Sequence, residues 1–339
     1  MKYSLQIKNT LFRTGFFALC QKVFSRRSVA ILRYHAIVEP DNNYYASPSI
    51  CITPDQFEAQ VAYLSANYHV IALDTVVDCL EHNKPFPEKA IAFTFDDGYR
   101  DNYLAYQILK KYNAAGTFYV TAGCIESQEI FWLFEIIYLV NVTLKTKLTF
   151  KTTGEELTYL LNSREEREFA ARKIVQFIKS NDREVRENIR AQLREQTADV
   201  ADFEEKASKV MLTWQQIREM QENGMTIGGH TMTHLNLPNA SADDAKNEIE
   251  HCKALLQEKT GGKIQHFSYP NGGPYAYYNT AIKNMVKKAG YKSATTSNNA
   301  QVALQDDVFE LNRIRVTKNL AEILYQINCE NVLNHFLKK

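Results

Sequence analysis

The sequence lacks the features that mark several classes of protein. Its 339 residues carry a formal net charge of +1, so no overall field favours nucleic acid or a strongly acidic partner. There is no C-x-x-C pair, and the six cysteines lie far apart, at Cys20, Cys51, Cys79, Cys124, Cys252 and Cys329. This spacing indicates buried thiols in a reducing compartment rather than a disulfide framework.

Long apolar runs are also missing. The run at residues 131–140 is too short to span a bilayer and contains a glutamate. Residues 11–24 are apolar and aromatic, but Arg13 interrupts them and no small-residue cleavage site follows, which argues against a secretory signal. We therefore expect a cytoplasmic protein. Residues 11–27 form either an amphipathic helix resting on the inner membrane or, as we favour, a helix packed on the protein body.

Most of the chain alternates between short aliphatic segments and amphipathic ones. Residues 30–35 and 90–95 are typical of buried strands, and Thr53-Pro54 supplies an N-cap and a proline suited to a helix start. The lengths suit parallel βαβ units, so we predict an α/β barrel or sheet.

The alternation breaks between about residues 125 and 210. This stretch is charged and helix-rich, with a candidate strand pair inside residues 142–150 and a capping pattern at Asn181 and Glu184. It predicts an insertion or a lid. The expected organisation is a helical segment at 1–29 followed by one domain at 30–339 that carries this insertion.

Two adjacent carboxylates, Asp96 and Asp97, follow the strand at 90–95. Ionised groups at the end of a buried strand are costly unless a metal or hydrogen bonds compensate them. Ligands of α/β folds bind at these carboxyl ends of strands, and Gly98 permits a sharp turn. The competing interpretation is a solvated β-turn.

Two histidines, His230 and His234, follow Gly228-Gly229. Their i, i+4 spacing predicts two imidazoles on one face of a helical turn. Together with one carboxylate they form a ligand set that leaves coordination positions for water and substrate, as catalytic metal sites do. The second carboxylate is then free to act as a base.

These motifs resemble those of the polysaccharide deacetylase superfamily, also called the NodB-homology or carbohydrate esterase 4 group. The resemblance covers nearly the whole chain outside the N-terminal segment and the insertion. It rests on Phe93-Thr94-Phe95-Asp96-Asp97-Gly98-Tyr99, Gly116-Thr117-Phe118-Tyr119-Val120, His230-Thr231-Met232-Thr233-His234 and Phe267-Ser268-Tyr269-Pro270-Asn271-Gly272.

The resemblance implies a distorted (β/α) barrel and a role for each motif. By the family pattern, Asp96 is the general base, and Asp97, His230 and His234 bind a divalent metal. Zinc is the usual metal, and cobalt, nickel or manganese are alternatives. Asn271, after Tyr269 and Pro270, matches the position of the oxyanion-stabilising donor.

The sequence departs from the family pattern at two places. The arginine expected to steady the base is replaced by Ser268, and Arg313 or Arg315 are candidates to take over, unless they form surface ion pairs. The late histidine acid has no clear match. However, Tyr34-His35 resembles an early motif of the branch that deacetylates poly-N-acetylglucosamine and related exopolysaccharides, so His35 is the expected acid.

The predicted function is therefore metal-dependent removal of N-acetyl groups from amino sugars of a polysaccharide, glycolipid or glycan precursor. The partner is an N-acetylated carbohydrate, and not a nucleic acid. A non-catalytic glycan-binding relative, a deformylase of a lipid-linked amino sugar and a non-haem iron oxygenase remain alternatives at this point.

Overall fold

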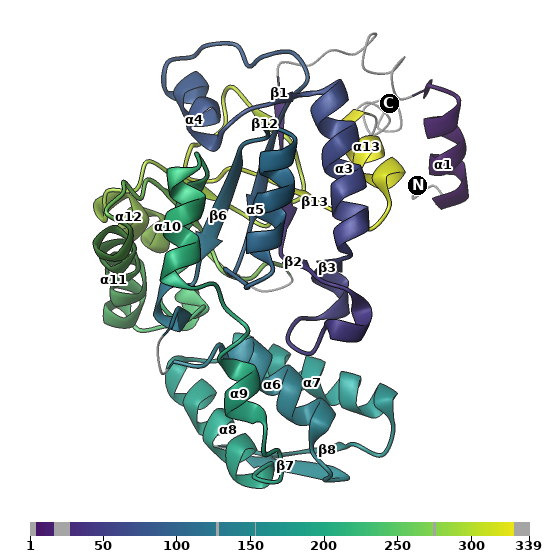
Figure 1. The fold of residues 1–339 in the computed structure, drawn as a ribbon. Helices are drawn as coiled ribbons and strands as arrows, with labels where there is room; N and C mark the ends of the chain where they lie inside the picture. The colour runs from purple at the N-terminus through teal and green to yellow at the C-terminus, as the bar shows by residue number, and fades with distance from the viewer. Residues whose placement is uncertain (1–4, 17–27, 127–128, 153, 274–275, 329–339) are drawn as a thin grey trace, which may run out of the picture.

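A curled, mostly parallel sheet forms the centre of the molecule. The computed structural model describes residues 5–16, 28–126, 129–152, 154–273 and 276–328 (Figure 1). The sheet has nine strands in the order β11-β10-β9-β6-β5-β1-β12, with β13 paired to β1 and β4 paired to β5. The strands are β1 Ser28–Tyr34, β4 His69–Val70, β5 Ala90–Phe95, β6 Gly116–Val120, β9 Thr226–Gly229, β10 His266–Ser268, β11 Ser293–Thr295, β12 Val302–Ala303 and β13 Ile314–Arg315.

The two edges of the sheet come together at residues 311–315. Leu311 forms a parallel bridge with Thr295 of β11, and β13 pairs in parallel with residues 32–33 of β1. The same short segment thus contacts both edges, which confirms the predicted distorted (β/α) barrel. Strand β13 is short, because only Ile314–Arg315 keeps strand pairing.

Helices cover the outside of the barrel because strand β5 and its neighbours are apolar on both faces. Phe95 and Phe118 stack on the outer face, at 4.5 Å between ring centroids, whereas Ile31 and Ala92 pack in a second, inner cluster. The covering helices are α3 Pro54–Asn67, α4 Leu73–Glu81, α5 Asn102–Lys111, α10 Trp214–Glu222, α11 Ala242–Thr260 and α12 Thr280–Lys288. The predicted helix start is confirmed, since Thr53 and Gln56 form a capping box.

Shorter elements complete the barrel. Strands β2 Ala36–Ile37 and β3 Cys51–Ile52 form a separate parallel pair beside the barrel mouth. Short 3₁₀ helices lie at Pro40–Asn42, Pro48–Ile50, Ala122–Cys124 and Leu237–Asn239.

A second group of helices lies at one end of the barrel (Figure 1). In the sequence this group follows β6 and precedes α10. It consists of α6 Trp132–Val142, β7 Lys147–Lys151, β8 Glu156–Leu160, α7 Arg164–Lys179, α8 Arg183–Gln196 and α9 Phe203–Ala207. We call this group the helical lobe. Its buried Glu135 holds Arg190 and Arg194, which ties α6 to α8.

Two local predictions in the lobe are wrong. The hairpin lies at residues 147–160 rather than inside 142–150, because α6 continues to Val142. Helix α8 is capped by the side chain of Asp182, which accepts from the Val185 backbone N–H, and not by Asn181.

The N-terminal helix α1, Leu5–Arg13, packs against α13, Leu320–Asn328. Phe12 makes an edge-to-face contact with Tyr63, and Lys8 pairs with Glu322 at 3.2 Å. The part of the N-terminal segment that the structure describes is therefore packed on the protein. The remainder of the predicted membrane-contact segment, residues 17–27, lies outside the described residues.

No helix among the described residues is long and apolar enough to cross a membrane. Cys51, Cys79, Cys124 and Cys252 are buried free thiols, as the cysteine spacing predicts. Cys20 and Cys329 lie outside the described residues.

Candidate active site

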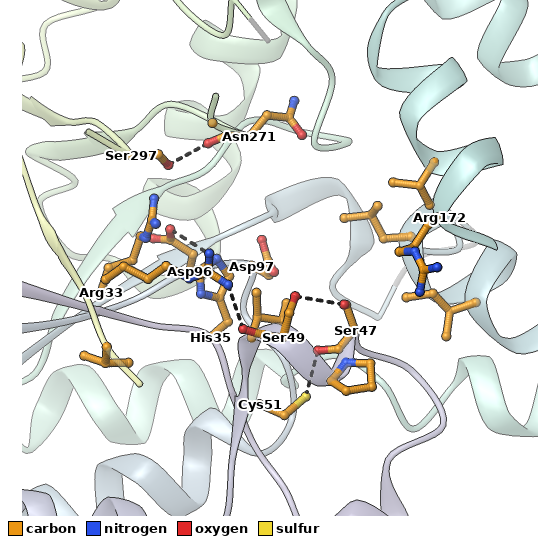
Figure 2. Close-up of a pocket in the computed structure, with 18 of the residues that line it drawn as sticks. Arg33, His35, Ser47, Ser49, Cys51, Asp96, Asp97, Arg172, Asn271 and Ser297 are labelled. Atoms are coloured by element: carbon orange, nitrogen blue, oxygen red, sulfur yellow. Dashed lines mark hydrogen bonds and ion pairs between the residues drawn. The ribbon is translucent and has the colours of Figure 1, made fainter. Parts of the chain in front are cut away.

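The predicted site residues gather at the carboxyl ends of the parallel strands. His35 follows β1, Asp96 and Asp97 follow β5, and the His230 loop follows β9. This edge opens into a pocket of about 1030 Å³ that the helical lobe also lines. Figure 2 shows His35, Asp96 and Asp97 side by side in this pocket. The barrel therefore brings together groups that are far apart in the sequence, such as His35 and His234, which are 199 positions apart.

Asp97, His230 and His234 form a compact ligand set. Each imidazole Nε2 lies 3.4 Å from Asp97 Oδ1, and the candidate ligand atoms all lie within 4.8 Å of one another. All three side chains are buried. Asp97 and Gly98 both have positive φ, +76° and +84°, so the backbone turns sharply enough to aim the Asp97 carboxylate at the histidines.

The two histidines do not share a helical turn, so that part of the prediction is wrong. They lie in an irregular loop in which Thr231 and His234 have positive φ, +67° and +56°. The loop is held by backbone bonds from Ala122 N–H to the Thr231 carbonyl and from Gly123 N–H to the Met232 carbonyl. A Cβ at Gly123 would lie 2.6 Å from that Met232 oxygen, so glycine permits the close approach.

Surrounding groups prepare the imidazoles for metal binding. His230 Nδ1 donates to the Ser268 carbonyl at 2.7 Å, which fixes its tautomer and leaves the Nε2 lone pair facing Asp97. Burial lowers the pKa of His234 to about 4, so this ring is neutral near pH 7. Burial acts to raise the pKa of Asp97, but its contacts with both histidines hold that pKa well below its usual value.

These residues fit a divalent metal such as zinc. Two neutral imidazoles and one carboxylate are a typical ligand set for catalytic zinc, with a position left for water or substrate. Among the described residues, His234 Nδ1 is a buried polar atom without a hydrogen-bond partner, whereas its Nε2 faces Asp97.

The second carboxylate, Asp96, is held by a buried arginine. Arg313 Nη1 and Nη2 donate to Asp96 Oδ1 and Oδ2, each at 2.7 Å, and Arg313 is fully buried. Burial acts to raise the pKa of Asp96, but the Arg313 charge and hydrogen bonds keep that pKa well below its usual value. Asp96 is therefore ionised near pH 7.

Of the two candidate arginines, Arg313 is the one that contacts Asp96. Ser268 stands at the family's arginine position, and its hydroxyl lies 3.0 Å from Arg313 Nη2. The small serine leaves room for a guanidinium that enters from the last strand of the sheet. The alternative of a surface ion pair is wrong for Arg313. Arg315 instead donates to the Ser49 carbonyl at 2.9 Å on the pocket rim.

His35 lies on the other side of Asp96, with its Nε2 3.7 Å from Asp96 Oδ2. Its side chain lines the pocket and is 20 % exposed, and its carbonyl accepts from Asn102. Burial lowers the pKa of His35 to about 4, so the ring is neutral at pH 7. Its position suits exchange of a proton with Asp96 and with a group in the pocket.

Asn271 lines the pocket, but Tyr269 and Pro270 are not among its lining residues. The Asn271 carbonyl accepts from the Ser297 hydroxyl at 2.6 Å (Figure 2), and its backbone N–H forms no hydrogen bond within the described part of the chain. Tyr269 packs in the outer core, stacks on Tyr278 and donates to the Phe309 carbonyl. Its contribution is to anchor the turn that presents Asn271.

The helical lobe adds pocket residues that the sequence did not reveal. Arg172 and Lys179 of α7 line the pocket. Figure 2 shows Arg172 on the side of the pocket opposite His35 and Asp96. Burial lowers the pKa of Lys179 to about 8 although Asp97 acts to raise it. Trp132 does not line the pocket; its indole N–H lies 3.4 Å from the His234 carbonyl. No spacing motif marks these residues, because they approach the site only through tertiary packing.

A buried arginine of the lobe also supports the histidine loop. Arg186 is 2 % exposed and donates from Nη1 to the Thr233 carbonyl at 3.2 Å and from Nη2 to the Thr233 hydroxyl at 3.1 Å. Glu248 accepts from the same hydroxyl and from the Thr233 N–H. The residue next to His234 is thus held from both the lobe and the barrel.

We expect Arg186→Met to weaken metal binding by about tenfold to a hundredfold, the range typical of groups that orient metal ligands. Arg186 is a positioning residue, since it acts through Thr233. Titration of the metal-free protein with zinc measures the affinity. Arg183→Met is the matched control, because Arg183 lies on the same helix with an exposed, 3.6 Å contact to Asp244. Equal zinc affinities of the two variants would contradict this role.

Comparison with known proteins assigns the chain to a family. The sequence profile of the polysaccharide deacetylase family matches residues 83–294, more than half of the chain. The protein therefore belongs to the polysaccharide deacetylases, which are hydrolases.

Individual relatives agree with this assignment. The Bacillus subtilis (strain 168) protein YxkH, which bears the same family assignment, is 22% identical over 86% of this chain and 72% of its own. The Streptococcus pyogenes deacetylase PplD, solved with acetate, has a TM-score of 0.58 at 23% identity, over 89% of this chain and 98% of its own. IcaB from Ammonifex degensii has a TM-score of 0.55 at 16% identity, over 90% and 99%. These structures share the fold of this chain.

Proposed function

We propose that the protein uses a divalent metal, zinc in the first instance, to remove N-acetyl groups from amino sugars of a polysaccharide, glycolipid or glycan precursor. One observation carries the proposal. Two adjacent carboxylates have separate partners: Asp97 faces two histidines, whereas Asp96 faces an arginine and the open pocket. This division supplies both a ligand and a base for amide hydrolysis.

Asp97, His230 and His234 would hold the metal, which supplies Lewis acidity and lowers the pKa of bound water. Asp96 has the position and the ionisation of the base that removes a proton from the attacking water. Arg313 fixes the plane of the Asp96 carboxylate, so the oxygen facing the pocket is set before substrate binds. The free Asn271 N–H is the chain's donor for the oxyanion that develops on the acyl oxygen.

His35 is the proposed acid that protonates the departing amine. An amide nitrogen leaves poorly as an anion, so a proton donor within reach is required. The 3.7 Å contact between His35 and Asp96 offers a short route by which the proton taken from water reaches the imidazole. The Tyr34-His35 pair favours the exopolysaccharide branch of the family as the source of the substrate.

Other functions have less support. A purely glycan-binding role does not require the intact ligand set or the buried arginine on Asp96. An iron oxygenase does not require a second carboxylate beside the triad, and the family is hydrolytic. Removal of a formyl group needs the same chemistry as removal of an acetyl group. The two activities differ in the size of the acyl group that the site must hold.

The test is acetate release from a panel of N-acetylated sugars by the purified protein loaded with zinc, cobalt, nickel or manganese. We expect release by at least one metal form, loss of release on chelation and recovery on adding that metal back. N-formylated sugars form a parallel arm, with formate as the product measured. Binding of these sugars without release of any acyl group would overturn the proposal.

A further inference from the structure

Among the described residues, the pocket is lined by more positively charged side chains than negatively charged ones. The charged lining residues are Arg33, Arg172, Lys179, Arg315 and Lys318 against Asp96, Asp97 and Glu168. Within the described ranges, none of these five cations forms an ion pair with a carboxylate, whereas Glu168 pairs with Arg164 outside the lining set. The pocket therefore offers free cations close to the reacting groups.

Arg33 is the most unusual of these residues. It lies near the end of β1, its Nε is buried, and that atom has no hydrogen-bond partner in the described part of the protein. Burial, together with the nearby Arg313 charge, lowers the pKa of Arg33 to about 10. Arg33 is half-buried and lines the pocket, and its unpartnered Nε is costly, so an anion bound in the pocket would satisfy this guanidinium.

A second guanidinium stands beside the first. Arg33 and Arg315 are paired residues of the parallel strands β1 and β13, so their side chains leave the same face of the sheet. Arg315 is exposed on the rim, where one bond to the Ser49 carbonyl holds it. Two like charges in register oppose folding, and an anion bound between them would remove that repulsion.

The carboxylates of the site already have other partners, and Asp96 acts on Arg33 only at longer range. Both oxygens of Asp96 are taken by Arg313, and Asp97 faces His230 and His234. Figure 2 shows Arg33 beside Asp96 and His35, so a group bound to Arg33 lies next to the reacting centre. The pocket volume of about 1030 Å³ leaves room for such a group together with the sugar.

We propose that the substrate carries an acidic group, a phosphate ester or a carboxylate, on the N-acetylated sugar or its direct neighbour, and that Arg33 and Arg315 bind it. The inference rests on the proposed deacetylase function and names its substrate class. Guanidinium groups suit this task because their planar N–H pairs match the oxygens of phosphate and carboxylate.

The first test compares substrates that share the same N-acetyl sugar. N-acetylglucosamine, N-acetylglucosamine 1-phosphate and a disaccharide of a hexuronic acid with N-acetylglucosamine are assayed for acetate release. We expect kcat/KM for at least one acidic substrate to exceed that for the neutral sugar by about tenfold or more, the size of one charged hydrogen bond. The preferred acidic substrate identifies the group.

Arg33→Gln and Arg315→Gln should each reduce this preference ratio by about tenfold. Arg218→Gln is the matched control: its exposed guanidinium donates to the Lys259 carbonyl, and it does not line the pocket. An acidic-to-neutral ratio near one in the wild type, or a ratio that Arg33→Gln leaves intact, would overturn the inference while the deacetylase proposal stands.

The second test does not depend on catalysis. Calorimetric titration of the chelator-treated protein with inorganic phosphate should show binding that weakens at least tenfold in Arg33→Gln and not in Arg218→Gln. If no sugar releases acetate, the deacetylase proposal fails, and this titration alone decides the anion site. Phosphate binding that is absent or insensitive to Arg33 would then overturn the site as well.

Discussion

Asp96→Asn should lower kcat by about a thousandfold, within the range that a positioned general base contributes. Asparagine keeps the shape of the side chain but cannot take a proton from water. The metal content should stay at the wild-type level, because Asp97, His230 and His234 are unchanged. Acetate release by the metal-loaded variant, together with metal analysis, measures both effects.

Asp101→Asn is the matched control for this substitution. Asp101 is a nearby aspartate that accepts a hydrogen bond from Tyr45 and does not line the pocket. Burial raises the pKa of Asp101 to about 6, so Asp101 is still mostly ionised at pH 7 and Asp101→Asn removes a buried negative charge, as Asp96→Asn does. Asp96→Asn also leaves Arg313 without its partner, so both variants are assayed below their melting temperatures. Activity of Asp96→Asn within tenfold of wild type would remove Asp96 from the role of base.

Arg313→Gln should destabilise the protein by about 3–5 kcal/mol, because it strands a buried carboxylate. In the wild-type folded protein the pKa of Asp96 lies below its usual value. The ion pair therefore contributes its full stability at pH values above the usual aspartate pKa. This contribution is lost only as the pH falls through the lower pKa of the folded state. Chemical denaturation at pH 7 measures the loss of stability.

The same substitution should alter the pH dependence of activity. Without the guanidinium, burial raises the pKa of Asp96, and the acid limb of kcat/KM should move upward by at least one pH unit. Arg313→Lys should give an intermediate shift, since an ammonium cannot bridge both oxygens. Ser268→Ala is the matched control. It removes a hydroxyl that contacts both Asp96 and Arg313, and it keeps the ion pair between these two residues. An unchanged acid limb in Arg313→Gln would contradict this account.

The residues that could be predicted from the sequence are those that directly follow strands. Asp96, Asp97 and His230 come at the ends of recognisable aliphatic segments, and parallel strands bring such ends to one edge. His35 also follows a strand, but its role as the acid was predicted from the resemblance of Tyr34-His35 to a family motif. The ligand set was therefore predicted, although the helical geometry assigned to His230 and His234 was wrong, because i, i+4 spacing does not distinguish a helix from a loop with positive φ.

The remaining features depend on packing that no local pattern records. Arg313 and Arg315 lie two residues apart, at and just before the short strand β13, and only the closure of the sheet shows which of them meets Asp96. In the sequence Arg33 is an ordinary strand residue. Only the structure shows that its Nε lacks a hydrogen-bond partner among the described residues. Arg186 and Lys179 lie in a charged, helix-rich stretch where solvated residues look the same in sequence.

The pairing of β13 with β1 has a consequence for the order of assembly. Residues 311–315 join the two edges of the sheet, and the same segment delivers the guanidinium that Asp96 needs, from 217 positions further along the chain. A folding intermediate in which this last strand has not docked would hold its ligand triad but leave its base without a counter-charge. The one segment thus both closes the sheet and supplies the counter-charge of the base.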